Sequence, residues 1–178
     1  MKLKLTLLSS LLLSSASTFA VTIAGGSINF EGELVNAACA VATDSTNQTV
    51  VLGQYRTASL AQAGDRTAPI PFQINLVDCD PEVQATAAIA FNGQTTDANA
   101  NLLATNASGL NSTAAENVGI EISDSTSTPL MLNGTGFSTP ITLSPGNNSL
   151  NFSARYVATG ASTPGTANAA ATFVINYE

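Results

Sequence analysis

The sequence has few of the residues that carry most enzyme chemistry. Its 178 residues include no histidine and no tryptophan, and five lysines and arginines stand against twelve aspartates and glutamates. Without imidazole there is no Ser-His-Asp triad and no histidine metal ligand. Both lysines, Lys2 and Lys4, precede residue 5, so a chain without its N-terminus offers no lysine for a Schiff base or a phosphate-binding loop. What stays open for chemistry is a carboxylate pair, a thiol, or nothing, and with neither of the first two favoured below we expect no enzyme, no metal site and no cofactor.

Positive charge is scarce beyond these two lysines. The remaining cations are Arg56, Arg66 and Arg155, and all twelve acids lie beyond residue 30, which gives that part of the chain a side-chain balance of −9. Such a surface repels phosphate backbones, so nucleic acid is not expected as a partner. Hydrophobic residues make up 44% and charged residues 10% of the chain, which favours one folded domain over a disordered chain.

The first twenty residues have the pattern of a secretory signal peptide. Lys2 and Lys4 precede a leucine-rich run, Leu5–Ala16, and small residues suited to signal peptidase follow, with cleavage expected after Ala20. The alternative cleavage site follows Ala24. The apolar run is too short to cross about 30 Å of hydrocarbon, so we expect release rather than anchoring. Removing 20 of the 178 residues leaves 158, exported into an oxidising compartment.

The two cysteines, Cys39 and Cys79, both lie in the exported part. An even count in an exported chain predicts a disulfide. Closing the intervening loop of 40 positions is worth about 4 kcal/mol in the chain-entropy model. A redox or nucleophilic role is disfavoured because there is no CxxC spacing and no nearby base or cation.

The exported part alternates apolar and polar residues with period two, bounded by Gly, Pro and Asn. This pattern predicts an all-β sandwich. The expected strands are Ser27–Glu31, Gln48–Leu52, Ile70–Leu76, Ala87–Phe91, Val118–Ile122, Leu130–Leu132, Ile141–Leu143, Leu150–Val157 and Ala171–Tyr177. A helix is plausible only over Thr57–Ala63, and Gln94–Ala115 reads as a surface loop with a weak strand.

The residues after the predicted cleavage site form an extended arm. Ala24, Gly26, Ile28 and Phe30 share one face of it. A Gly25-Gly26 pair suits a strand interior poorly unless another backbone approaches closely there. The pattern is compatible with strand addition to the sheet of another molecule, and equally with an ordinary first strand that is frayed at its start.

Several motifs resemble one known family. They are FEGELVNAACAV (30–41), VLGQYRTASL (51–60), INLVDCD (74–80), ARYVATG (154–160), TPGTANA (163–169) and ATFVINYE (171–178). Together they resemble the type 1 fimbrial major subunits of the chaperone–usher pilin family, over essentially the whole exported chain. The stretch 94–151 matches more loosely.

The resemblance implies an incomplete immunoglobulin-like β-sandwich that lacks its last strand. A periplasmic chaperone would lend a strand, and at an outer-membrane usher the arm of the next identical subunit would replace it. The implied donor residues are Ala24, Gly26, Ile28 and Phe30, and the implied groove and chaperone-binding residues are Gly165, Phe173, Ile175 and Tyr177. Cys39 and Cys79 match the disulfide of the family.

The resemblance also implies the organisation and function. Residues 1–20 would be the signal peptide, 21–32 the donor-strand extension and 33–178 the pilin domain. The expected function is that of a major structural subunit in a surface fimbrium, assembled with minor subunits and a tip adhesin and used for cell adhesion and host colonisation. The alternatives are a minor or adaptor subunit of the same family and a small secreted carbohydrate-binding β-sandwich.

One candidate for a catalytic or Ca²⁺-binding cluster is the acidic run Asp78-Cys79-Asp80-Pro81-Glu82. A glycosidase needs two carboxylates that face a cleft, and an EF-hand needs a loop Gly and a distal Glu. The run instead favours a solvated turn after a strand.

Overall fold

The computed structural model describes residues 23–32, 34, 37–97, 99–109 and 112–178. The predicted signal peptide and the cleavage position expected after Ala20 lie outside the described residues, whereas the alternative position after Ala24 lies within them. The chain divides into two units, Met1–Leu34 and Val35–Glu178, which we call the arm and the body. No helix among the described residues is long and apolar enough to cross a membrane.

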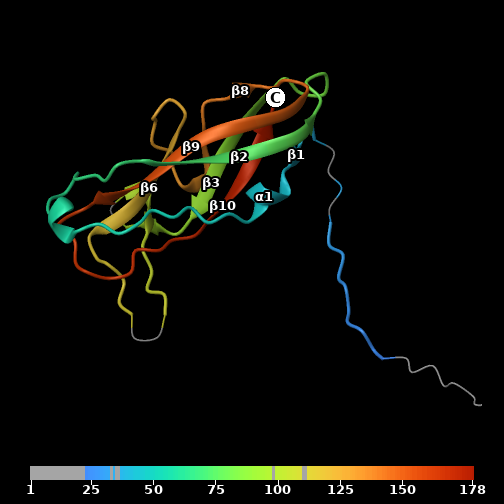
Figure 1. Cartoon of the computed structure of the whole chain (residues 1–178). Coiled ribbons are helices and arrows are strands. Elements are labelled where there is room, and N and C mark those ends of the chain that lie inside the picture. Colours follow the sequence, from blue (N-terminus) through green and yellow to red (C-terminus); the bar gives the residue numbers. More distant parts are fainter. Residues whose placement is uncertain (1–22, 33, 35–36, 98, 110–111) are drawn as a thin grey trace, which may run out of the picture. The chain divides into compact units, whose positions relative to one another are not determined.

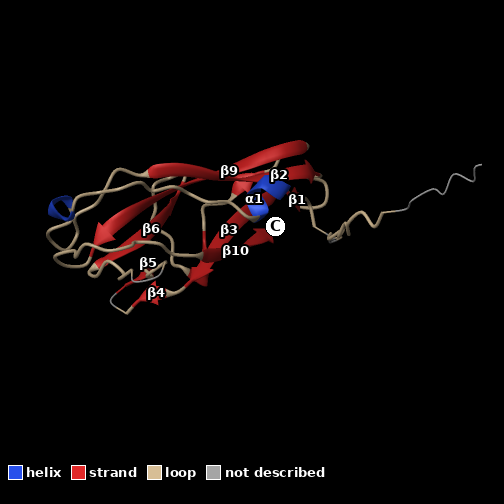
Figure 2. Ribbon diagram, turned by 60° about the horizontal axis from the view of Figure 1, so that its bottom comes forward, coloured by secondary structure: helices blue, strands red, loops and turns tan. Residues whose placement is uncertain are grey.

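Nearly all of the regular elements of the body are strands, as the alternation predicted (Figures 1 and 2). The strands are β1 (Ala40–Val41), β2 (Ile70–Cys79), β3 (Thr86–Gly93), β4 (Thr95–Thr96), β5 (Asn99–Ala104), β6 (Val118–Asp124), β7 (Asn133–Phe137), β8 (Ile141–Thr142), β9 (Gly146–Ala158) and β10 (Ala171–Tyr177). One short helix, α1 (Thr43–Thr46), and one 3-10 turn, Thr57–Ser59, complete the described elements. The helix expected over Thr57–Ala63 is therefore reduced to a single turn.

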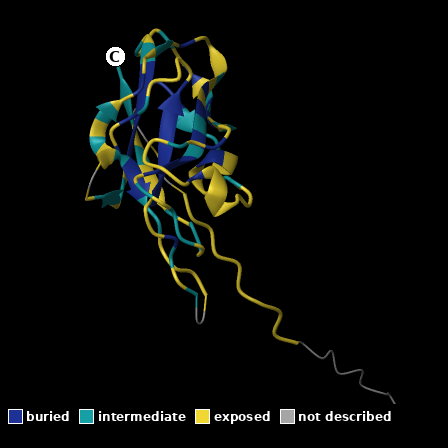
Figure 3. Cartoon of the chain, turned by 90° about the vertical axis from the view of Figure 1, so that its left-hand side faces the viewer, coloured by how far each residue is buried: buried dark blue, intermediate teal, exposed yellow. Residues whose placement is uncertain are grey.

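The strands form two sheets. The larger has the order β1-β2-β9-β6-β5-β4, and the smaller has the order β10-β3-β7, with β8 also paired to β3. Their pairings are antiparallel. Figure 3 shows the buried strands at the centre of the body, with exposed segments around them.

The core lies between the two sheets. Its fully buried side chains include Ile74, Leu76, Ile89, Leu132 and Leu150, and burying each contributes about 1.5–3 kcal/mol. A chain of aromatic rings crosses from sheet to sheet. The ring of Phe152 stacks on that of Phe72, with centroids 5.6 Å apart, and meets the ring of Phe91 edge-on, with centroids 5.0 Å apart. The centroid of the Phe91 ring lies 6.3 Å from that of Phe173 in β10.

Three predicted strands are not strands in the structure. Ser27–Glu31 and Gln48–Leu52 carry no strand pairing. Leu130–Leu132 crosses between the sheets instead, because Leu130 N donates to Ile122 O of the larger sheet and Gly93 N of the smaller sheet donates to Leu132 O. Both leucines are buried, so their apolar side chains belong to the core although the segment forms no β-strand.

Two buried acids are held by polar partners. Glu121 of β6 pairs with Arg155 of β9, whose NH2 group lies 2.6 Å from its carboxylate, and with Arg66 at 3.6 Å. Asp124 accepts hydrogen bonds from the backbone N–H of Thr126, Thr128 and Thr139 and from two threonine hydroxyls. Every buried side-chain nitrogen or oxygen among the described residues has a hydrogen-bond partner.

Candidate assembly interface

The last strand, β10, is paired along one edge only. Its seven residues match β3 in unbroken register from Ala171–Gly93 to Tyr177–Ala87. Among the described residues no strand pairs with its other edge. A row of unpaired N–H and C=O groups at such an edge is a template for another strand.

The side chains of β10 show the same incompleteness. Phe173, Ile175 and Tyr177 lie opposite the buried residues of β3 and pack against the core. None of the three is itself buried. Val174, on the other face, is 52% exposed. An apolar row that faces a core but stays half exposed indicates that one element covering the core is missing there.

A second half-buried apolar pair lies on a different segment. Val50 and Leu52 pack against the core, in a stretch that carries no strand pairing. The nearby edge of β2, by contrast, is capped by side chains. Ser45 Oγ accepts from Asn75 N at 3.0 Å, and Gln48 Nε2 donates to Gln73 O at 3.1 Å. The edge of β10 has no comparable caps among the described residues.

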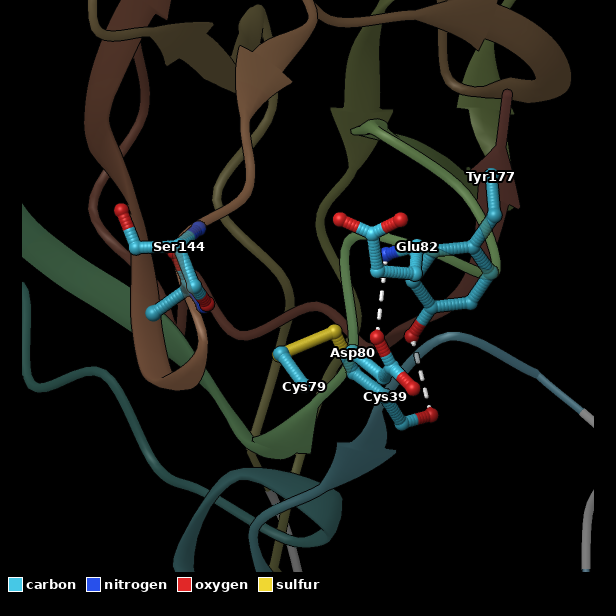
Figure 4. The surroundings of a disulfide bond; sticks show 7 residues. Cys39, Cys79, Asp80, Glu82, Ser144 and Tyr177 are labelled. Carbon is cyan, nitrogen blue, oxygen red and sulfur yellow. Dashed lines mark hydrogen bonds between the residues drawn. A yellow bond between two sulfur atoms is a disulfide. The ribbon is translucent and has the colours of Figure 1, made fainter.

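The predicted disulfide is present. Cys39 and Cys79 are both buried and bonded to each other, which joins the start of β1 to the end of β2. Figure 4 shows the Tyr177 hydroxyl directed at the same place, where it donates to the Cys39 carbonyl at 3.3 Å. Burial raises the pKa of Tyr177 above its ordinary value, so the hydroxyl keeps its proton and donates.

Gly165, predicted as part of the C-terminal motif, lies six positions before β10. A Cβ there would meet Ala115 N at 2.5 Å and the Ala114 carbonyl carbon at 2.6 Å. Only glycine allows this approach without a backbone shift. Thr166, the next residue, accepts from Ala115 N with its carbonyl. The structure thus gives Gly165 a packing role and does not bring it into the row formed by Phe173, Ile175 and Tyr177.

The arm, considered by itself, is extended and exposed. Ala24, Gly26, Ile28 and Phe30 are all exposed, and Ile28 and Phe30 are 80% and 91% accessible. Sequence reasoning ended this face at Phe30. The same alternation continues through Gly32 to Leu34, whose side chain is 102% exposed. Extending the period-two pattern by two more steps would have added Leu34 to the apolar face.

The acidic run begins in the last two residues of β2 and continues into a turn. Asp80 Oδ1 accepts from Glu82 N at 3.0 Å, as Figure 4 shows, and Asp78, Asp80 and Glu82 are all exposed. The cysteine between the acids is consumed by the disulfide. No group of three potential metal ligands was found among the described residues.

Comparison with known proteins agrees with this architecture. A family model described as "Fimbrial protein" matches residues 28–178. The chain belongs to the fimbrial protein family. It is 58% identical over 158 residues to the type-1 fimbrial protein, A chain, of Salmonella typhi, which covers 89% of this chain and 85% of that protein. It is 50% identical to the type-1 fimbrial protein, A chain, of Escherichia coli K12, covering 99% and 97%. The family resemblance inferred from the motifs is confirmed.

Solved structures of fimbrial proteins have the same fold. A subunit in a chaperone–usher pilus, studied for rod uncoiling, superposes with a TM-score of 0.74 at 24% identity and covers 90% of this chain and 100% of its own. The P pilus rod subunit PapA gives a TM-score of 0.66 at 23% identity, covering 80% and 100%. At these identities the likeness establishes the pilin fold, the incomplete all-β sandwich that was predicted.

Proposed function

We propose that this chain is the major structural subunit of a surface fimbrium and that its arm completes the sheet of another copy at β10. The observation that carries the proposal is the one-sided pairing of β10, with its half-exposed row Phe173, Ile175 and Tyr177. The similarity to type-1 fimbrial A chains, which extends over most of both sequences, supports the same function.

The arm has the length and pattern for this role. Ile28–Leu34 spans seven residues, as many as β10, and places Ile28, Phe30, Gly32 and Leu34 on one face. An added strand gains main-chain hydrogen bonds along β10, and each buried aliphatic or aromatic side chain contributes about 1.5–3 kcal/mol. Ala24 and Gly26 extend the donor face toward the N-terminus.

One donor and one acceptor on each copy give an open assembly. The contact is head-to-tail, and such a contact propagates into a filament when the rotation between neighbouring copies does not close into a ring. Before assembly, the free edge of β10 is an aggregation hazard. A periplasmic chaperone would therefore cover it, and an outer-membrane usher would exchange chaperone for arm. Minor subunits and a tip adhesin would share the same contact, and the fimbrium would serve adhesion and colonisation rather than catalysis.

Deletion of Val21–Phe30 tests the proposal. Cells that supply chaperone and usher should assemble no fibres from the deleted chain, although the chaperone should still bind it. The matched control replaces the exposed polar residues Ser27 and Asn29 with alanine, leaves the apolar face intact and should keep fibre formation. Electron microscopy with subunit quantification reads both outcomes. Fibres of ordinary length from the deleted chain would contradict the donor role, and a trace share of purified fibre mass would indicate a minor subunit.

A further inference from the structure

The exported chain offers proteases with basic specificity very few sites. It contains no lysine beyond Lys4, and Arg56, Arg66 and Arg155 are its three arginines. These three arginines differ in their backbone pairing and in their ion pairs.

Arg155 lies within the larger sheet, and the segment around Arg66 is hydrogen-bonded to β9 of that sheet. Arg155 lies in the middle of β9, where the ladder pairs it with Glu121 of β6 and its side chain is 23% exposed. The Arg66 side chain is 50% exposed, and its NH2 group lies 3.6 Å from the Glu121 carboxylate. Its backbone, however, forms an isolated bridge to Val157, and Thr67 N donates to Tyr156 O of β9. A protease binds its substrate as an extended, accessible segment, so cleavage after Arg155 requires strands to separate first, and cleavage after Arg66 requires its backbone to come away from β9.

Arg56 lies in a different setting. It is exposed, makes no ion pair among the described residues, and has an extended backbone with φ −80° and ψ 137°. Residues 51–55 before it belong to no strand. The one turn after it is closed by Ser59 N, which donates to Arg56 O, and by Leu60 N, which donates to Thr57 O. Cleavage requires this short turn to open and the hydrogen bonds that Ser162 donates to Thr57 O and Leu60 O to break, but no strands have to separate. Exposed connections of this kind are where nicking concentrates.

The disulfide determines what such a cut would release. Cys39 lies before Arg56 and Cys79 lies after it, and the two are bonded. A chain cut after Arg56 therefore stays one covalent molecule, in which the piece that carries the arm is tied to the body through sulfur.

We propose that Arg56–Thr57 is the single site at which an arginine-specific protease nicks the folded, exported subunit, and that the Cys39–Cys79 bond keeps the nicked subunit joined. In the step, water adds across the peptide bond, leaving a carboxylate on Arg56 and an amino group on Thr57. If the arm is the donor strand of the proposed function, the cut leaves the link between neighbouring subunits intact, and the fibre tolerates it.

Trypsin digestion of the purified folded subunit tests the site. Without reductant the product should run as one species of unchanged mass apart from the added water, and with reductant as two pieces that meet between Arg56 and Thr57. Arg56→Gln should slow the first cut by about tenfold or more, whereas the control Arg66→Gln should leave the cut after Arg56 unchanged. A first cut at Arg66 or Arg155, no cut in the folded subunit, or pieces that separate without reductant would overturn the proposal.

Arg56→Lys gives an independent test that gains a signal. A lysine-specific protease should leave the folded wild-type subunit whole and should cut the variant once, after position 56. An uncut variant whose urea-unfolded form is cut would show that the loop is not accessible.

Intact fibres test the consequence separately. Nicked fibres should keep their length until reductant is added, and un-nicked fibres treated with reductant serve as the control. Fibres that break on nicking alone would refute the tether. The subunit digestion does not depend on assembly, so a failure of the donor role would leave its result unchanged.

Discussion

Two strands of equal length in the body have opposite surroundings. β6 and β10 each have seven residues, and all seven are buried in β6 whereas none is buried in β10. β6 lies between β5 and β9 and is paired on both edges, whereas β10 lies at the end of its sheet and is paired on one. Both contain alternating isoleucine or aromatic residues directed at the same core.

This difference separates stability from assembly. A strand that is fully covered within its own chain contributes to folding, because its apolar surface is already removed from water. A strand with the same alternation but an open edge keeps part of its apolar surface in contact with water, and that surface is buried only when another strand pairs with it. Substitutions in β6 should therefore be measured as loss of folding, and substitutions in β10 or the arm as loss of assembly.

The largest effect on assembly is expected in the arm, at the residues proposed to pair with β10 of another copy. Ile28→Asp would place a carboxylate against an apolar row, which costs several kcal/mol unless the charge is paired. We expect at least a tenfold loss of fibre yield, measured by quantifying fibres shed from cells. Ser27→Asp, one position away on the opposite face, is the control and should keep most assembly. Equal losses for the two variants would contradict the alternating donor face.

The next effect compares the two strands directly. Ile122→Ala in β6 should lower the free energy of unfolding of the unassembled subunit by about 3 kcal/mol, since it leaves a cavity in a closed core. Ile175→Ala in β10 should cost about 1 kcal/mol in the same urea titration, because that side chain is half exposed. In a measurement of how strongly fibres resist dissociation, Ile175→Ala should have the larger effect of the two substitutions. A larger loss for Ile175→Ala in the unassembled subunit would mean that β10 is already covered.

Only part of this contrast could be predicted from the sequence. The bounds of β10 and most of β6 followed from period-two alternation. Alternation alone cannot distinguish Phe173 and Ile175 from Leu150 and Phe152, because burial depends on which strands lie beside them. That distinction came from the family resemblance. The hydrogen bonds to Asp124 could not be predicted, because their donor groups come from separate loops. Leu34 was not included in the donor face, because Gly32 interrupts the row of apolar side chains.

A smaller effect concerns Asp124, at the end of β6. Burial raises the pKa of its carboxyl, but hydrogen bonds from Thr126, Thr139 and Thr128 outweigh burial and hold the pKa well below its ordinary value of 3.8. A depressed pKa in the folded state gives stability that is fully present above the unfolded pKa and is lost as the pH falls through the folded one. Asp124→Asn should therefore cost about 2 kcal/mol at pH 7.

This penalty should shrink steadily below about pH 4, because Asp124 then takes up a proton in the unfolded chain while it stays ionised in the folded one, which lowers the stability of the wild type. Urea titrations at several pH values measure the difference between the two proteins. Asp80→Asn, in the exposed turn after β2, is the control and should change stability little. A penalty for Asp124→Asn that stays constant down to pH 2 would show that the ionised carboxylate is not what the loops hold.

The smallest effect is expected at the end of β10. Tyr177→Phe removes the hydroxyl that donates to Cys39 O at 3.3 Å and keeps the ring. The loss should be about 1 kcal/mol or less, measured by thermal unfolding of the oxidised subunit. Tyr156→Phe, which removes a bond of 2.9 Å to Ala167 O from a more buried ring, should cost more. The opposite order would mean that the end of β10 is held more firmly than its exposure indicates.

Amide hydrogen exchange in intact wild-type fibres tests the central claim most directly, with β6 as the internal reference. If the arm of a neighbouring copy pairs with β10, the amides along both edges of β10 should be protected to the same degree as those of β6, and the amides of Ile28–Leu34 should be protected with them. If alternate amides of β10 exchange within seconds in intact fibres, or if the arm exchanges freely while β10 is protected, the arm does not complete the sheet.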